Sequence, residues 1–188
     1  MKLYNSVEDF NKALNTLIGQ KILNVEYIGL NYSDEYENTY LTHIDNVHTM
    51  DLAILIYTEN NVYEITWDSS FFQYGIGVEI HNNTGFKSES EIKWNVSNDT
   101  FWKNYLEKTI IGFRVMWDTI NQMEIMTKKI EKVYTYPQTC RIFFKEIDDE
   151  IIVSVAEFYS DKEDKIIGFK DHLIVTNDVE IARKIKIL

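Results

Sequence analysis

Residues 52–67 read Leu52-Ala53-Ile54-Leu55-Ile56-Tyr57-Thr58-Glu59-Asn60-Asn61-Val62-Tyr63-Glu64-Ile65-Thr66-Trp67. Two runs rich in β-branched and aromatic residues flank a short polar segment, which is typical of a β-hairpin. The first run does not alternate and predicts a central strand buried on both faces. The second run alternates apolar with polar residues, so we expect one of its faces to meet water. The asparagine pair suits a tight turn that requires positive φ.

A second hairpin of the same kind lies in the C-terminal half, where Arg141–Lys145 leads through Asp148-Asp149 to Ile151–Ala156. Each hairpin is preceded by a helix signal. Ser6 can cap the first helix, and Ser97, Asn98 or Asp99 can cap the second. Apolar residues follow at helical spacing. They are Phe10, Ala13, Leu14, Leu17 and Ile18 in the first half and Trp102, Tyr105, Leu106 and Ile110 in the second.

Both helix patterns end on an apolar pair and a glycine, which can take the left-handed conformation that ends a helix. These segments are Leu17-Ile18-Gly19-Gln20-Lys21-Ile22 and Ile110-Ile111-Gly112-Phe113-Arg114-Val115. Two further pairs match in order: Ile44–Val47 with Ile130–Val133, and Gly75–Ile80 with Ile167–Lys170. The common order predicts an internal duplication. Chance is the alternative, because alternating helices and hairpins are ordinary.

The sequence therefore predicts an α+β protein of two tandem diverged modules, residues 1–92 and 95–188, packed together as one compact unit. Each module is expected to hold one helix and an antiparallel β-meander of about four or five strands, since hairpin connections imply antiparallel pairing. A helix covering one face of a sheet is the usual α+β solution.

The formal net charge of −11 is unevenly distributed along the chain. Residues 1–93 contain 5 lysines, no arginine and 14 acidic residues, so they carry −9 of it. Such a field repels nucleic acid and anionic lipid and attracts a basic partner. A merely solvated acidic surface is the alternative.

Cellular location is predicted from what the sequence lacks. No stretch has the length of a signal peptide or a membrane span. The single cysteine, Cys140, rules out an internal disulfide framework and is expected to be a small buried side chain. We expect a soluble, cytoplasmic protein.

No motif of a catalytic site is found. The chain has no nucleophile elbow and no phosphate-binding glycine loop. Asp148-Asp149-Glu150 falls at a predicted turn, where adjacent acids are usually turn formers. His43 and His48 lack the clustering of a metal site. We therefore expect no catalysis, no metal and no cofactor.

Two segments have the composition of a partner-binding surface. The first, 33–40, mixes acids with tyrosines, which provide contact area at low entropic cost. The second, 67–75, gathers aromatic residues after a strand. The predicted partner-binding residues are Asp34, Glu35, Tyr36, Glu37, Glu64, Trp67, Asp68, Phe71, Phe72 and Tyr74. The alternatives are a plain solvated loop for the first segment and buried core anchors for the second.

The runs Val62-Tyr63-Glu64-Ile65-Thr66-Trp67-Asp68 and Tyr74-Gly75-Ile76-Gly77-Val78 together resemble a strand–turn–strand pattern of small bacterial proteins, some of which are similar to immunity proteins of polymorphic toxin systems. The second half departs from it, with Val155-Ala156-Glu157 in place of the Trp-Asp pair. The resemblance implies a cytosolic protein that binds and blocks a cognate toxin.

We therefore expect a non-catalytic inhibitor that binds a basic protein, plausibly a nuclease or other toxin, through its N-terminal half. Two alternatives remain. One is a small-molecule or carbohydrate-binding domain that uses the aromatic segment as a stacking surface. The other is an oligomeric scaffold, which predicts a large apolar two-fold interface.

Overall fold

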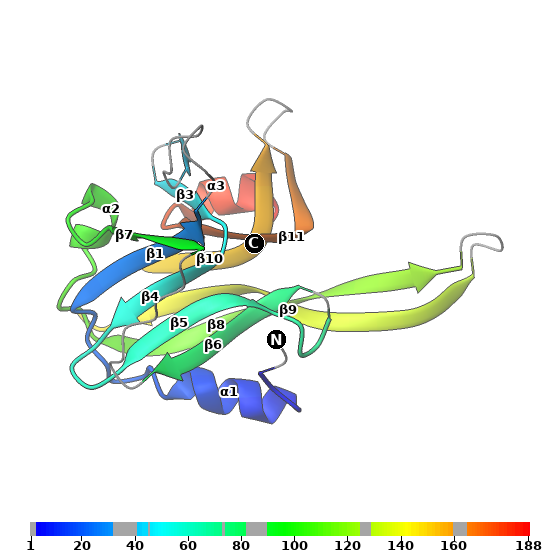
Figure 1. Cartoon of the computed structure of the whole chain (residues 1–188), viewed down its shortest axis with the longest axis horizontal. Helices are drawn as coiled ribbons and strands as arrows, with labels where there is room; N and C mark the ends of the chain where they lie inside the picture. Colours follow the sequence, from blue (N-terminus) through cyan, green and yellow to red (C-terminus); the bar gives the residue numbers. More distant parts are fainter. Residues whose placement is uncertain are drawn as a thin grey trace.

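The computed structural model describes residues 3–31, 41–44, 46–72, 74–81, 90–124, 129–159 and 165–188. It is a mostly β protein in which two antiparallel sheets pack against each other (Figure 1). The helices are α1 (Val7–Asn15), α2 (Thr100–Lys103) and α3 (Val179–Lys184). The strands are β1 (Asn24–Leu30), β2 (Leu41–Ile44), β3 (Val47–Met50), β4 (Ala53–Tyr57), β5 (Val62–Asp68), β6 (Gly75–His81), β7 (Glu91–Asn95), β8 (Ile110–Met123), β9 (Ile130–Phe144), β10 (Glu150–Tyr159) and β11 (Lys165–Thr176).

Each sheet is built on a four-strand meander. The first sheet has the order β6-β5-β4-β1-β7 and the second β2-β3-β11-β10-β9-β8. Within them β1, β4, β5 and β6 pair in succession, as do β8, β9, β10 and β11. A helix precedes each meander, so the coarse prediction of an α+β protein with antiparallel sheets is confirmed.

The two sheets exchange strands between the halves of the chain. The β2–β3 hairpin, which belongs to residues 1–92, pairs with β11 of the second sheet. Strand β7, at the predicted junction, pairs with β1 at the edge of the first sheet. The sheets therefore do not divide the chain at the predicted boundary.

The first helix begins where the sequence predicts but ends at Asn15, so Leu17 and Ile18 of the predicted pattern lie beyond it. The Ser6 side chain caps α1 by accepting a hydrogen bond from the Asp9 backbone N–H at 3.1 Å. Gly19 then adopts φ +85°, the left-handed conformation expected after the helix. Phe10 and Leu14 lie on the buried side of the helix.

The second helix is shorter than predicted. Asp99 caps α2, which ends at Lys103, and Glu107 rather than a glycine takes a positive φ of 62°. Ile110 and Gly112, predicted to end the helix, lie in β8. Pairing of β8 with β9 across the sheet overrides the local helical pattern, as tertiary contacts commonly do.

Two other local predictions were wrong. The segment 58–61 and the Asp148-Asp149 turn contain no positive φ angle, since the positive φ values of described non-glycine residues fall at Asn46, Glu107 and Lys186. Ile44 and Val47 lie on either side of the β2–β3 turn, whereas Ile130–Val133 runs inside β9. Those two segments therefore do not correspond.

The main core lies between the sheets. Strand β4 occupies the centre of the first sheet, and its residues Ala53–Ile56 are buried, as predicted. Inward-facing residues of both sheets meet there together with the buried side of α1. They include Tyr27, Ile54, Ile56, Tyr63, Ile65, Cys140, Ile142, Phe144, Val153, Val155, Leu173 and Val175.

The outer faces of the two sheets differ. On the second sheet, α3 and the residues after it cover Ile152, Ala156 and Ile174. On the first sheet a small apolar cluster of Ile28, Ala53, Leu55 and Val62 forms without any of the described helices. None of the described helices is long and apolar enough to cross a membrane.

Strands β8 and β9 extend beyond the sandwich as a two-stranded ribbon (Figure 1). We call its distal part, residues 117–124 and 129–136, the arm. Most of its side chains are exposed, including Met123, Ile130 and Val133, which are each more than half exposed at 54%, 57% and 55%.

Candidate functional site

The structure divides the predicted partner-binding residues between two hollows. Asp34, Glu35, Tyr36 and Glu37 lie outside the described residues. Glu64, Trp67 and Asp68 come from β5 and line a cleft on the outer face of the first sheet. Phe71 and Phe72, in the turn between β5 and β6, line a groove beside the arm.

The cleft has an apolar floor and carboxylates on its walls. Its volume is about 360 Å³. Four of its lining residues are acidic, and most of the others are apolar. The lining residues are Leu3, Ile28, Leu52, Ala53, Glu64, Thr66, Trp67, Asp68, Glu79 and Glu91. We call it the acidic cleft.

Strand pairing brings the carboxylates of the acidic cleft together. Glu64 on β5 lies directly opposite Glu79 on β6. Like charges placed directly opposite each other destabilise a sheet. Glu91 reaches the cleft from β7 at the far edge, and its Oε2 atom is shielded from solvent with no hydrogen-bond donor among the described residues. The arrangement favours a cation in the cleft.

The folded protein disfavours the ionised form of the Glu64 carboxylate. Its Oε2 lies 2.8 Å from Nε2 of His81, and the Glu64 side chain is only 13% exposed. Burial raises the pKa of Glu64 above its ordinary 4.5, and the nearby Glu79 and Glu91 act in the same direction, while the bond to His81 opposes them. Lack of water and like charges thus both disfavour the ionised form.

Asp68 has a structural role within the same cleft. The residue is 2% exposed. Its carboxylate accepts hydrogen bonds from the backbone N–H of Leu3 at 3.1 Å and of Ser70 at 2.9 Å. A Cβ at Gly77 would lie 2.7 Å from that of Asp68, so this glycine makes room for the contact. Asp68 therefore ties the N-terminal segment to the end of β5.

The aromatic segment 67–74 does not form one open stacking surface. The rings of Trp67 and Tyr74 pack edge to face with their centroids 5.8 Å apart, and both side chains lie against the main core. Phe71 packs on Phe10 of α1 and Trp117 of β8 at 5.9 and 5.1 Å. Trp67, Phe71 and Tyr74 therefore pack partly against the core, which is the alternative expected from the sequence for this segment.

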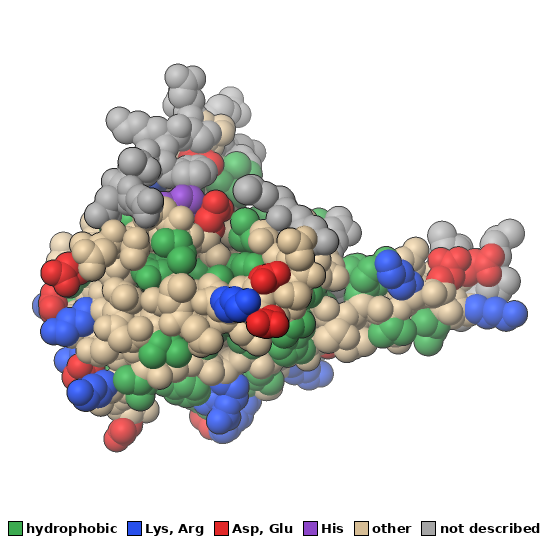
Figure 2. All heavy atoms as spheres, turned by 90° about the horizontal axis from the view of Figure 1, so that it is seen from below, with side chains coloured by type: hydrophobic (Ala, Val, Ile, Leu, Met, Phe, Trp, Pro, Cys, Tyr) green, Lys and Arg blue, Asp and Glu red, His purple; other side chains and the backbone are tan. Residues whose placement is uncertain are grey.

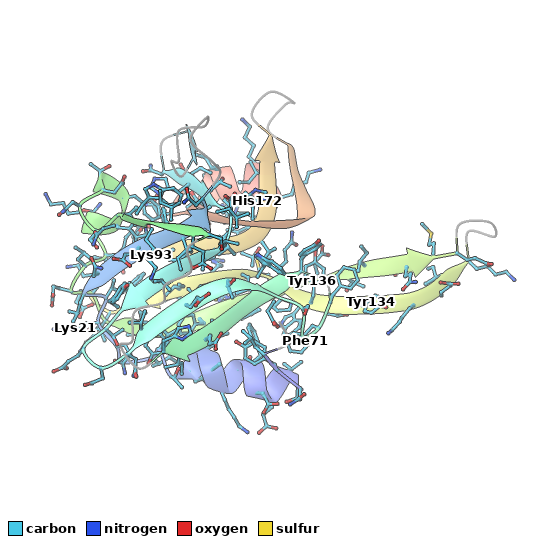
Figure 3. The ribbon with its side chains drawn as sticks, viewed as in Figure 1. Lys21, Phe71, Lys93, Tyr134, Tyr136 and His172 are labelled. Atoms are coloured by element: carbon cyan, nitrogen blue, oxygen red, sulfur yellow. The ribbon has the colours of Figure 1, made fainter. Side chains whose placement is uncertain are left out.

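The groove beside the arm was not predicted from the sequence. Its volume is about 600 Å³. The turn between β5 and β6 forms one wall and β8 and β9 form the other. Phe72 packs against Tyr134 and Tyr136 of β9 at 4.7 and 5.8 Å. Figure 3 shows these two tyrosines and Phe71 where the arm leaves the body. The lining residues are Ser69, Phe71, Phe72, Ile120, Asn121, Gln122 and Tyr134.

Histidine and cysteine side chains make structural contacts. His48 is buried against Tyr27, and His172 pairs with Asp51 at 3.1 Å. Cys140 is buried as predicted, and burial raises the pKa of its thiol to about 12, which makes it unreactive. No group of three His, Cys, Asp or Glu side chains suited to a metal ion occurs among the residues that the structure describes.

We expect Glu64→Gln to stabilise the protein at neutral pH. Because the folded-state pKa of Glu64 is raised, the folded state binds more protons than the unfolded state just above pH 4.5, and stability falls as pH rises through that window. Glutamine removes the charge and keeps an acceptor for His81. Denaturant unfolding at pH 7 should show a gain of up to about 1 kcal/mol, the scale of a charge pair directly opposite across two strands.

The gain from Glu64→Gln should shrink as the pH approaches 4.5. The matched control is Glu59→Gln at the exposed β4–β5 turn, which should change stability by less than about 0.5 kcal/mol. A less stable Glu64→Gln variant at pH 7 would contradict the electrostatic account of the acidic cleft.

Comparison with known proteins found no match to this chain. No protein-family model matches the chain, no curated protein matches it, and no solved structure matches its fold.

Proposed function

We propose that the protein is a non-catalytic inhibitor that binds a basic protein partner in the acidic cleft of its first sheet. The acidic cleft is the observation that supports this function. Glu79 and Glu91 face an apolar floor and make no ion pair with a cation of the described residues. The charge distribution adds to it, because residues 1–93 carry −9 of the net charge.

The cleft fits the side chain of a lysine or arginine. Ile28 and Ala53 offer an apolar floor to its aliphatic stem, and the carboxylates of Glu79 and Glu91 receive its charged end. The negative field of the first half steers a basic partner and raises the association rate. Desolvated charge pairs in the cleft then slow its release. Binding would block the partner by occlusion, without chemistry.

The test is capture of the basic partner by variants of the cleft. The double change Glu79→Lys and Glu91→Lys should weaken binding strongly, since losing a buried charge pair costs about 2–5 kcal/mol. The control is Glu59→Lys with Asp148→Lys, which makes the same change of net charge at exposed turns. The control variant should alter only the association rate of the partner and the salt dependence of that rate. Equal binding by all three proteins would contradict the proposal.

A bacterial immunity protein is the class of inhibitor that we propose, so the first probe is the product of the gene beside this one. The expected gene arrangement is a large secreted toxin gene directly upstream. Binding is measured at low and moderate salt, because electrostatic steering weakens with ionic strength. The same assay tests the acid–tyrosine segment through Asp34→Lys, Glu35→Lys and Glu37→Lys. An isolated gene, or a neighbouring product that does not bind, would contradict the immunity role.

We further infer that the two halves are diverged copies of one module. Each half has a helix followed by a four-strand meander, with the β2–β3 hairpin inserted in the first. The segments that follow the two helices also pair with each other, through a bridge between Lys21 and Thr109. Superposing β1-β4-β5-β6 on β8-β9-β10-β11 tests the duplication. Hairpins that fail to align would contradict it.

A further inference from the structure

The β8 edge of the arm is an unprotected strand edge. β8 ends the order of the second sheet, and beyond Ile110 its outer edge pairs with none of the described strands. An isolated two-stranded ribbon is marginally stable in water, and an open edge is a template for another strand. Among the residues that the structure describes, no strand pairs with the arm along β8.

The two edges of the arm are not alike. Proline and lysine are common devices that keep an edge strand from pairing. Strand β9 carries both, with Pro137 at the base of the arm and Lys132 further out. Residues 115–124 of β8 contain no lysine, arginine or proline. The β8 edge is thus the one that can accept a strand.

A groove lies over one face of the arm, where Ile120 of β8 is paired with Tyr134 of β9. It is formed between Ile120, Asn121 and Gln122 of β8 and the turn that carries Phe71 and Phe72. Its volume is about 600 Å³. A strand added to the open β8 edge would bind by main-chain hydrogen bonds, and its side chains can reach this groove on the adjoining face.

Charge indicates which protein supplies that strand. Residues 117–136, the sequence that spans the arm and its connection, contain three acidic residues and three lysines and are formally neutral in a chain of net charge −11. Figure 2 shows both signs of charge mixed toward the end of the arm. A basic partner gains nothing from the arm, whereas two arms of this chain can meet without repulsion. A second copy of the chain is therefore the occupant that fits.

The geometry points to a two-fold dimer in which the β8 edges of two copies pair antiparallel about Ile120. That alignment sets Ile120 against its own equivalent and Asp118 against Gln122 of the second copy. Centring the pair on Asn121 would instead oppose Asp118 to Glu124, two like charges, which destabilises a sheet. Two-fold symmetry makes the contact self-complementary, as in most homodimers. None of the β8 residues in this pairing lines the acidic cleft of the first sheet.

The first test is the mass of the protein in solution, by light scattering or analytical ultracentrifugation across micromolar concentrations. The wild type should have twice the chain mass of 22.3 kDa. Ile120→Lys places two like charges across the two-fold axis and should raise the dimer dissociation constant at least about tenfold. Val133→Lys, on β9 of the same arm, should remain a dimer. A monomeric wild type, a dimeric Ile120→Lys or a monomeric Val133→Lys would overturn the edge pairing.

Disulfide trapping gives an answer even if Ile120→Lys fails to fold. Cys140 is buried, so an introduced thiol is the only accessible one. Ile120→Cys should form a covalent dimer on mild oxidation, because directly opposed Cβ atoms lie about 5 Å apart. Val133→Cys should not, and a monomeric oxidised Ile120→Cys would overturn the proposal. The Glu79→Lys and Glu91→Lys variant should keep the dimer mass, which separates this test from that of partner binding.

Discussion

Replacing Phe10 with alanine should reduce the free energy of unfolding by about 3–5 kcal/mol, the usual cost of removing a buried phenylalanine side chain. Phe10 is fully buried where α1 meets the two sheets. Its ring packs edge to face on Tyr4, Phe71 and Trp117 at 5.2, 5.9 and 5.9 Å. The change would leave a cavity among rings from the N-terminus, the β5–β6 turn and β8.

Denaturant unfolding measures the effect of Phe10→Ala, with a lower midpoint and an unchanged slope expected. The matched control is Val7→Ala on the same helix, where the side chain is 47% exposed and the change should stay within about 0.5 kcal/mol. Tryptophan fluorescence should also change, since Trp117 loses a neighbouring ring. A loss below about 1 kcal/mol would show that α1 does not anchor the core.

Replacing Tyr27 with phenylalanine should cost about 2–3 kcal/mol, because it removes the centre of a buried hydrogen-bond chain. Trp102 Nε1 donates to the Tyr27 hydroxyl at 2.5 Å. That hydroxyl lies 2.9 Å from Nδ1 of His48. Burial lowers the pKa of His48 and keeps the ring neutral, so Nδ1 can accept a hydrogen bond from the hydroxyl. The chain links α2, the first sheet and the second sheet.

The loss in Tyr27→Phe arises chiefly from the Trp102 indole N–H, which stays buried without its acceptor. Tyr134→Phe is the matched control, because its hydroxyl donates to Gln122 on the exposed arm. That variant should be as stable as the wild type within about 0.5 kcal/mol. Equal stability of Tyr27→Phe and Tyr134→Phe would contradict a structural role for the chain.

Local physics explains which predictions were right. Ser6 and Asp9 are three residues apart, and the capping bond between them depends on no distant residue. The unbroken apolar run in β4 predicts a central strand because both of its faces must be covered. Gly19, in the turn that follows α1, takes the predicted left-handed conformation because glycine adopts positive φ without steric cost.

Non-local pairing explains where the sequence misled. Ile110 and Gly112 fit a helical pattern, yet both join β8 because β9 offers them a ladder of hydrogen bonds. The β2–β3 hairpin follows β1 in the chain but pairs with β11, a partner more than a hundred residues away. Neither outcome has a signal in the neighbouring residues.

The candidate site shows the same division. Composition alone shows that the first half is acidic, and the alternation in β5 places Glu64 on the face of the sheet opposite the main core. Only the fold sets Glu64 opposite Glu79 and brings Glu91 to the same cleft from the other edge of the sheet. The sequence by itself determined the start of the first helix, the central strand β4 and the sign of the charge, because capping, periodicity and composition act over a few residues. The tertiary structure decided the sheet order, the acidic cleft and the open β8 edge, because strand pairing joins residues that the chain keeps far apart.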